Sequence, residues 1–351
     1  SWLWEPQSTN FIIQSELFSG WAKVATSVFG NNIASPSGEI NATRIVESAT
    51  NSVHSLSLGG VTTGNQYTVS VFAKAKERSI LSFGGLGLYS NNEFVQYDLI
   101  NGTAINTGTT NNASVDIKGY GNGWYRCTAT YTATGGSGLV IAMLDQLYTG
   151  NSSTGAGQLY QGDGTSGLYI WGAQVEALSY PTSYIPTEGS TVTRNRDFCN
   201  NGGSLASINS GSGTFFVDFK YLTDNDSSNA NWFGIESATG NSRVLFYKSA
   251  NNNQRLLIIN NLDIVFNNTS LFNIVKNQQY KLAVRYDSGN ISVYLNGTEI
   301  DTSTNTYTSP IENLVTISLN ESNQDLGCKL KSLVVWKEGL SDSELQSLTT
   351  I

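Results

Sequence analysis

The segment from Tyr280 to Ile300 constrains the fold more than any other part of the chain. Its apolar residues fall on every second position, at Tyr280, Leu282, Val284 and Tyr286 and, after a four-residue turn, at Ile291, Val293 and Leu295. A period of two is typical of a strand with one buried face. Lys281, Arg285 and Ser292 have the opposite parity and are expected to face water or a ligand. Asn296-Gly297 suits a second tight turn, so the segment predicts two successive β-hairpins.

Composition predicts a pair of globular domains and excludes some partners. The 351 residues suffice for two domains, and 17 Tyr, 14 Phe and 7 Trp supply enough large side chains for packed sheets. The net charge of −8 argues against nucleic acid and anionic membranes as partners. No apolar run approaches the roughly 20 residues of a membrane span, so membrane insertion is not expected.

Cysteine and histidine usage excludes the common metal sites. Cys127, Cys199 and Cys328 are far apart in the sequence, and His54 is the one histidine, so a His/Cys zinc site cannot be assembled. Free thiols are expected, with one disulfide as the alternative.

The first half of the chain alternates short apolar strands with Gly, Asn and Ser clusters. Strands are expected over 65–74, 123–132, 139–144 and 168–175. Many short strands without a helical period predict a β-sandwich or jelly roll.

Four phrases in residues 1–195 resemble those of a carbohydrate-binding-module-like jelly roll. They are EPQSTN (5–10), GNGWYR (121–126), IWGAQVE (170–176) and SYPTSYIPT (179–187). This module recurs in structural proteins of tailed bacteriophages, notably in fibres and other host-contacting appendages. The phrases are typical of the scaffold, and Trp171 and Tyr184 are expected to fill the core rather than to contact sugar.

A polar stretch at 190–197 predicts the domain boundary, which gives domains 1–194 and 195–351. Further strands are expected over 214–222, 231–236, 242–248, 254–260, 280–286, 291–295, 314–319 and 328–336. One short C-terminal helix is predicted by the capping box from Ser341 to Glu344. The order of these elements, with the central hairpin at 280–297 and the closing strand and helix at 330–345, resembles the concanavalin A-like or laminin G-like fold. The fold class is therefore all-β, with two antiparallel sandwiches.

Catalytic patterns are missing from the sequence, whereas sugar-binding residue types are plentiful. Hydrolases of the concanavalin A-like fold commonly carry E-x-D-x-E or E-x-D-x-x-E along one strand, and neither pattern occurs here. Aromatic rings stack on pyranose faces, and Asn, Gln and Arg bond to sugar hydroxyls. The candidate carbohydrate-binding residues are Trp232, Tyr247, Asn251, Asn253 and Arg255 in the second domain and Tyr89, Gln96 and Tyr97 in the first.

No cofactor is expected, with one open alternative. Asp224 and Asp226 lie in an expected loop, where a solvated turn competes with a Ca²⁺ or sugar site.

Three functions remain open from the sequence. The first is a non-enzymatic virion protein of a tailed phage, such as a tail fibre or receptor-binding appendage, displayed on the virion surface and bound to host cell-surface polysaccharide. Such a protein would contact other virion proteins and form a homo-oligomer, such as a trimer. The second is an architectural or decoration protein that makes mainly protein contacts. The third is a capsular polysaccharide depolymerase or lyase.

Overall fold

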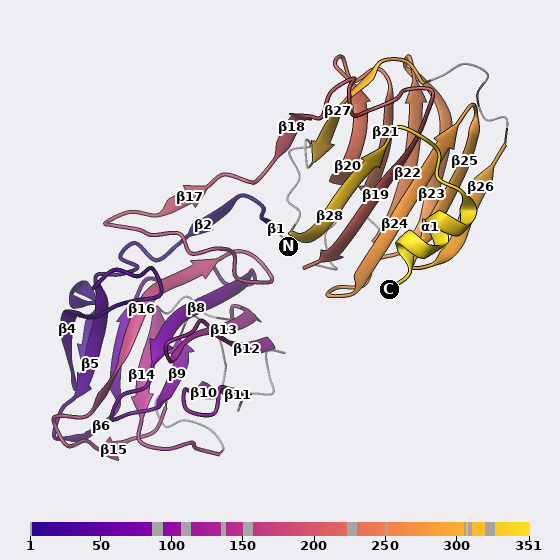
Figure 1. Cartoon of the computed structure of the whole chain (residues 1–351). Helices are drawn as coiled ribbons and strands as arrows, with labels where there is room; N and C mark the ends of the chain where they lie inside the picture. The colour runs from indigo at the N-terminus through magenta and orange to yellow at the C-terminus, as the bar shows by residue number, and fades with distance from the viewer. Residues whose placement is uncertain are drawn as a thin grey trace. The chain divides into compact units, whose positions relative to one another are not determined.

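The chain forms two compact units (Figure 1). This computed structural model describes residues 2–85, 94–106, 114–134, 138–149, 157–222, 230–249, 252–304, 307, 311–319 and 327–351, without the side chains of Trp2, Asn200, Asn201, Ala230, Asn231 and Trp232. Residues 8–194 form the N-terminal unit, whereas Asn195–Ile351 together with Ser1–Gln7 form the C-terminal unit. Both consist of antiparallel sheets, so the expected all-β class is confirmed. No helix in the described residues has the length and apolarity to cross a membrane.

The N-terminal unit is a sandwich of two six-stranded sheets. The first has the order β11 (Thr103–Asn106), β10 (Val95–Asp98), β9 (Ile80–Gly85), β14 (Leu139–Leu144), β7 (His54–Leu58) and β3 (Ala22–Val24). The second has the order β12 (Ser114–Gly119), β13 (Trp124–Thr132), β8 (Gln66–Lys74), β16 (Gly167–Glu176), β5 (Ala42–Glu47) and β4 (Thr26–Ile33). Two small ribbons pair β15 (Tyr160–Gln161) with β6 (Asn51–Ser52) and β17 (Val192–Arg194) with β2 (Ser8–Asn10), and a 3-10 turn covers Phe18–Gly20.

Three of the four quoted phrases, those at 5–10, 170–176 and 179–187, contribute to a buried polar network. Asn10 donates to the carbonyls of Ala173 (3.2 Å) and Ile185 (2.9 Å). The fully buried Glu176 accepts bonds from Ser8 (2.7 Å), from the Gln174 amide (2.6 Å) and from the backbone and hydroxyl of Thr182 (3.0 and 2.5 Å). Because each of these buried groups needs a partner, the phrases specify the scaffold.

Trp171 and Tyr184 pack on the same sheet, as expected. Trp171 is 5% exposed, and its ring lies 4.5 Å from that of Tyr184 and 5.3 Å from that of Phe72. The expectation that these rings serve the core is confirmed.

A second buried carboxylate, Glu47, joins three separate segments. Its two oxygens accept bonds from Nε and Nη2 of Arg78 (2.7 and 2.6 Å), from the Tyr160 hydroxyl (2.7 Å) and from the Asp163 amide (2.9 Å). Burial opposes its ionisation, but the bonds from Arg78, Asp163 and Tyr160 outweigh burial and lower the pKa of Glu47. The ion pair is therefore part of the fold of this unit.

The C-terminal unit is also a sandwich of two six-stranded sheets. One has the order β1 (Trp2–Trp4), β28 (Cys328–Trp336), β19 (Ser212–Tyr221), β24 (Gln279–Asp287), β25 (Asn290–Leu295) and β26 (Thr298–Ser303). The other has the order β18 (Cys199–Gly202), β27 (Leu314–Leu319), β20 (Ala230–Ser237), β21 (Arg243–Lys248), β22 (Asn253–Asn260) and β23 (Asp263–Asn273).

The two hairpins expected at 280–300 are confirmed. Val284 pairs with Val293, and Ser288 and Gly289 form a two-residue turn with φ of 48° and 88°. Asn296 and Gly297 have φ of 50° and 85° and form the second turn. Every apolar residue of the β24 alternation is buried between the sheets, with Tyr280, Leu282, Val284 and Tyr286 all at most 2% exposed. The period in the sequence therefore identified the core face.

The first residues of the chain pair with its end. Trp2 lies opposite Leu330 and Trp4 opposite Cys328. The Glu5 amide donates to Asp197 Oδ2, and the Asp197 amide donates to the Glu5 carbonyl, both at 2.9 Å. Residues 1–7 thus lie in the C-terminal unit, although the sequence alone grouped them with the first domain. An exposed edge of β28 accounts for this, because a short segment can complete it through backbone bonds.

In the part of the chain that the structure describes, the one α-helix, α1 (Asp342–Thr349), packs on the outer face of the sheet that contains β24–β26 (Figure 1). The expected capping box is present, and Leu345 is fully buried against Phe216, Ala283 and Tyr294. The helix is therefore held in place on the outer face of this sheet by Leu345.

Three strands of the C-terminal unit, β1, β18 and β23, were not expected from the sequence. β23 is an edge strand with register shifts against β22, and its Asn267-Asn268-Thr269-Ser270 centre is polar. Such a strand lacks the alternation of apolar and polar residues from which the other strands were predicted.

The three cysteines are free, as expected, with Cys127 and Cys328 buried.

Candidate functional site

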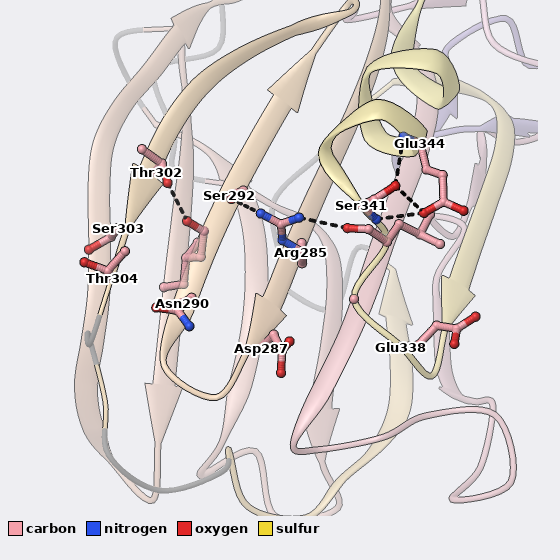
Figure 2. Close-up of a pocket in the computed structure, with 13 residues that line it drawn as sticks. Arg285, Asp287, Asn290, Ser292, Thr302, Ser303, Thr304, Glu338, Ser341 and Glu344 are labelled. Atoms are coloured by element: carbon pink, nitrogen blue, oxygen red, sulfur yellow. Dashed lines mark hydrogen bonds between the residues drawn. The ribbon is translucent and has the colours of Figure 1, made fainter.

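A pocket of about 590 Å³ lies on the outer face of the β24–β25–β26 sheet, beside the start of α1 (Figure 2). We name it the Arg285 pocket. Its lining residues are Arg285, Asp287, Asn290, Ile291, Ser292, Thr302, Ser303, Thr304, Glu338, Gly339, Leu340, Ser341 and Glu344. Strand parity explains the location, because Arg285 and Ser292 point away from the core that their neighbours Val284 and Val293 fill.

Arg285 lies at the centre of the pocket and is held from both sides (Figure 2). Its Nη2 donates to Ser292 Oγ (2.7 Å), and its Nη1 donates to the Leu340 carbonyl (2.9 Å) and pairs with Asp342 Oδ1 (2.7 Å). Ser292 is 4% exposed. Gly339 permits the approach of this side chain, because a Cβ there would lie 3.2 Å from Arg285 Cγ and Cδ. The guanidinium therefore links β24, β25 and the segment before α1.

The capping box of α1 forms the next wall. The Ser341 hydroxyl and amide donate to Glu344 Oε2 at 2.6 and 2.8 Å, and Ser341 Oγ accepts from the Glu344 amide at 3.4 Å. The hydroxyl bond and then the amide bond lower the pKa of Glu344, so this carboxyl is ionised at neutral pH. The wall is thus pre-organised by local backbone capping.

Most of the other lining side chains are exposed and polar, whereas Ile291 is buried and Leu340 is half-buried. Asp287 and Glu338 are exposed carboxylates, and Thr302 donates its hydroxyl to the Ile291 carbonyl at 3.2 Å. Carboxylates accept hydrogen bonds, and hydroxyls both donate and accept them. Such a surface suits a ligand rich in hydroxyl groups. No aromatic ring belongs to the described lining, so contact here depends on hydrogen bonds rather than on stacking.

Two of the sequence-predicted residues meet on a different surface, the β21–β22 hairpin. Tyr247 and Arg255 are cross-strand neighbours, with Arg255 Nη1 3.2 Å from the Tyr247 hydroxyl and the guanidinium carbon 5.6 Å from the ring centroid. Arg255 Nε also donates to the Thr269 carbonyl at 3.0 Å. Asn253 begins the same strand and is half-buried. Trp232 lies on the adjacent β20, but its side chain falls outside the described part of the chain, as does Asn251.

The candidates of the N-terminal unit do not form an exposed site. Gln96 is fully buried and its side chain bonds to the backbone of Tyr148, through Nε2 to the carbonyl (2.7 Å) and Oε1 from the amide (2.8 Å). Tyr97 is also fully buried and packs 4.9 Å from Phe83. Burial removes both from the residues that a glycan could contact in this structure. Tyr89 lies outside the described residues.

The metal alternative finds no support in the described residues. Within them, no three His, Cys, Asp or Glu side chains converge on a possible metal position. Asp224 and Asp226 lie outside the residues that the structure describes.

Sequence reasoning did not single out the Arg285 pocket. The available signal was the polar parity of Arg285 and Ser292 on the central hairpin, together with the capping box at Ser341. These segments are about 50 residues apart in the sequence, and only packing of α1 on the sheet brings them together.

Comparisons with known proteins return solved structures of low similarity. The chain is similar over 44% of its length to a heptameric SAP-like pentraxin from Limulus polyphemus (16% identity, TM-score 0.35, 75% of that chain). It is similar over 43% of its length to the CBM40 of an IT-sialidase from Ruminococcus gnavus (16% identity, TM-score 0.34, 93% of that chain). It is also similar over 44% of its length to a botulinum neurotoxin serotype D binding domain (13% identity, TM-score 0.33, 42% of that chain). The comparison with curated proteins returns no match.

A family model accounts for the segment that carries the pocket. Residues 204–346 match the model described as the Concanavalin A-like lectin/glucanases superfamily. The resemblance expected from the sequence is thereby confirmed for this segment. Residues 204–346, the segment that matches this model, include every residue lining the Arg285 pocket.

Proposed function

We propose that the chain is a glycan-binding adhesion protein and that the Arg285 pocket is its binding site. The observation that carries this proposal is an open, polar pocket of about 590 Å³ on a domain of the lectin/glucanase type. Its volume falls within the roughly 300–1,000 Å³ of small-ligand sites. Hydroxyl, carboxylate and amide groups line it, and these groups serve sugar hydroxyls through directional bonds.

The carboxyl chemistry favours binding over hydrolysis. A glycosidase needs one carboxylic acid that stays protonated near neutral pH, which burial or a like charge provides. Every described carboxyl with a shifted pKa has that pKa lowered: Glu47, Glu77, Asp98, Asp163 and Glu344. Glu344, the member of this group in the pocket, is therefore suited to accept hydrogen bonds and not to donate a proton.

Placement on a tailed-phage virion is the second part of the proposal and rests on the four phrases in residues 1–195. A shallow, solvent-exposed site gives weak binding per copy, and several copies on one particle raise avidity by factors of roughly 10² to 10⁴. The proposal therefore includes a homo-oligomer, such as a trimer, on the virion surface. Mass photometry at micromolar concentration tests the oligomer, and a purely monomeric protein would remove that part.

Glycan-array binding followed by calorimetry tests the function, with variants that separate the two candidate surfaces. Arg285→Ala should abolish binding because it removes the side chain that links β24, β25 and the segment before α1 around the pocket. Thr302→Val should weaken binding because it removes an exposed hydroxyl of the lining without disturbing the core. Tyr247→Ala on the other sheet should leave binding unchanged. Loss of binding in Tyr247→Ala alone would move the site to the β21–β22 hairpin.

Two further outcomes would replace the proposal. Release of reducing ends from a bound polysaccharide would indicate a depolymerase. Failure to bind any glycan, together with stable assembly on other virion proteins, would indicate the architectural function.

A further inference from the structure

The charges at the Arg285 pocket are unequal. Asp287, Glu338 and Glu344 contribute three carboxylates to the described lining, against one guanidinium. All three acids are exposed, so each can meet a ligand directly. Figure 2 shows Asp287 and Glu338 below Arg285 in that view, and Glu344 in the first turn of α1.

The guanidinium is already engaged by the protein. Asp342 Oδ1 lies 2.7 Å from Nη1, and the same nitrogen donates to the Leu340 carbonyl. Nη2 donates to Ser292 Oγ at 2.7 Å. These contacts use three of the five guanidinium N–H donors, and the Asp342 carboxylate offsets the positive charge that an anionic ligand would meet. Arg285 therefore shapes the pocket without making it a receptor for acids.

The acid at the helix start keeps its charge. Bonds from the Ser341 hydroxyl and amide lower the pKa of Glu344 and favour its ionised form. The positive charge of Arg285 is paired with Asp342, so the negative charge of Glu344 has no such partner in the lining.

We propose that the Arg285 pocket selects neutral or amino-bearing sugars and rejects glycans that carry carboxylate or sulfate groups. This inference rests on the proposed function of the pocket. The three carboxylates accept bonds from hydroxyl and ammonium donors, whereas an acidic sugar offers a like charge and no donor at its acid group. The chain's net charge of −8 acts in the same direction at longer range.

Matched glycan pairs that differ in charge test the selectivity. The probes are lactose against 3′-sialyllactose, methyl-esterified against free hexagalacturonate, and glucosamine hexamer against chitohexaose. In the two pairs that contain an acidic glycan, we expect the neutral member to bind about tenfold more tightly at low ionic strength. In the third pair, the amine-bearing glucosamine hexamer should bind at least as well as its acetylated form, chitohexaose. The difference should shrink in about 0.5 M salt, because salt screens exposed charges.

A charge-matched pair of variants assigns the effect to the pocket. Asp287→Asn with Glu338→Gln should reduce the neutral-to-acidic ratio several-fold. Asp263→Asn with Glu312→Gln removes the same charge from exposed residues outside the lining and should leave that ratio within about twofold.

The outcomes separate this inference from the proposed function. Equal or preferential binding of the acidic members, or an unchanged ratio in the pocket variant, would overturn the selectivity while glycan binding stands. Absence of binding to every probe and every array glycan would overturn both.

Discussion

Each unit contains an arginine paired with a carboxylate, and the two pairs differ in burial. In the N-terminal unit, Glu47 has a fully buried side chain and receives four hydrogen bonds, two of them from Arg78. In the C-terminal unit, Arg285 is the more buried partner, at 22% exposure, and Asp342 is 68% exposed. The same chemistry therefore stabilises the fold in one unit and shapes an open pocket in the other.

The consequence of removing the arginine differs accordingly. A buried carboxylate that loses its cation keeps its desolvation cost, whereas an exposed carboxylate is rehydrated. The shortest N–O distances in the two ion pairs are nearly equal, at 2.6 Å for Arg78–Glu47 and 2.7 Å for Arg285–Asp342. Burial of the acid, and not the distance, therefore decides how much stability depends on the arginine.

The largest effect is expected from Arg78→Ala. This change leaves the Glu47 carboxylate buried without its cation and should cost the N-terminal unit about 3–5 kcal/mol of unfolding free energy. Hydrogen exchange of β5 and β16, read by mass spectrometry, measures the loss. Arg44→Ala breaks a pair with Glu77 in which the two side chains are 23% and 41% exposed, and it should cost at most about 1 kcal/mol. Equal losses in the two variants would contradict the argument from burial.

Acid should destabilise the N-terminal unit through Glu47. Its folded-state pKa lies below the ordinary value of 4.5, so its contribution is present above about pH 4.5 and is lost as the pH falls through the folded pKa. Melting temperatures from pH 7 to pH 3 measure this. Glu47→Gln should be less stable than the wild type at pH 7 and should show a shallower decline below pH 4.5. Parallel curves for the two proteins would show that Glu47 does not contribute.

Arg285→Ala should have a smaller effect on stability. It removes bonds to Ser292 and Leu340 but strands no buried charge, so we expect a cost of about 1–2 kcal/mol in the C-terminal unit. Urea denaturation measures the change, and Arg285→Lys serves as a charge-preserving control. A cost as large as that of Arg78→Ala would mean that Asp342 is not as accessible to water as the structure indicates.

The smallest effect is expected at the helix cap. Ser341→Ala removes the side chain that accepts from the Glu344 amide and should cost about 1 kcal/mol. Exchange of the first amides of α1 should accelerate, while β24 and β25 remain protected. Ser343→Ala is the neighbouring control, because its hydroxyl is not the N-cap. Equal exchange in both variants would count against the capping box as the determinant of this pocket wall.

The sequence predicted the fold where local pattern and burial agree. The alternation at 280–295 identified the core face of β24 and β25, and the capping box identified α1. The sequence did not predict β23, because its polar centre lacks alternating apolar residues. It also misplaced residues 1–7, whose partner strand β28 is about 325 residues away in the sequence.

The candidate sites show the same limit. Tyr247 and Arg255 are neighbours because hairpin partners are close in sequence. Gln96 and Tyr97 were chosen by residue type and proved to be buried, since type alone does not give orientation.

What the sequence alone determined is the alternation of faces, the tight turns and the capped helix, because these depend on neighbouring residues. What only the tertiary structure decided is which polar side chains meet. Arg285 became the centre of a pocket when α1 packed on its sheet, and Glu47 became a buried anchor when strands from distant segments closed around it. Contacts between distant segments follow from how the sheets and helix pack together, which no local pattern encodes.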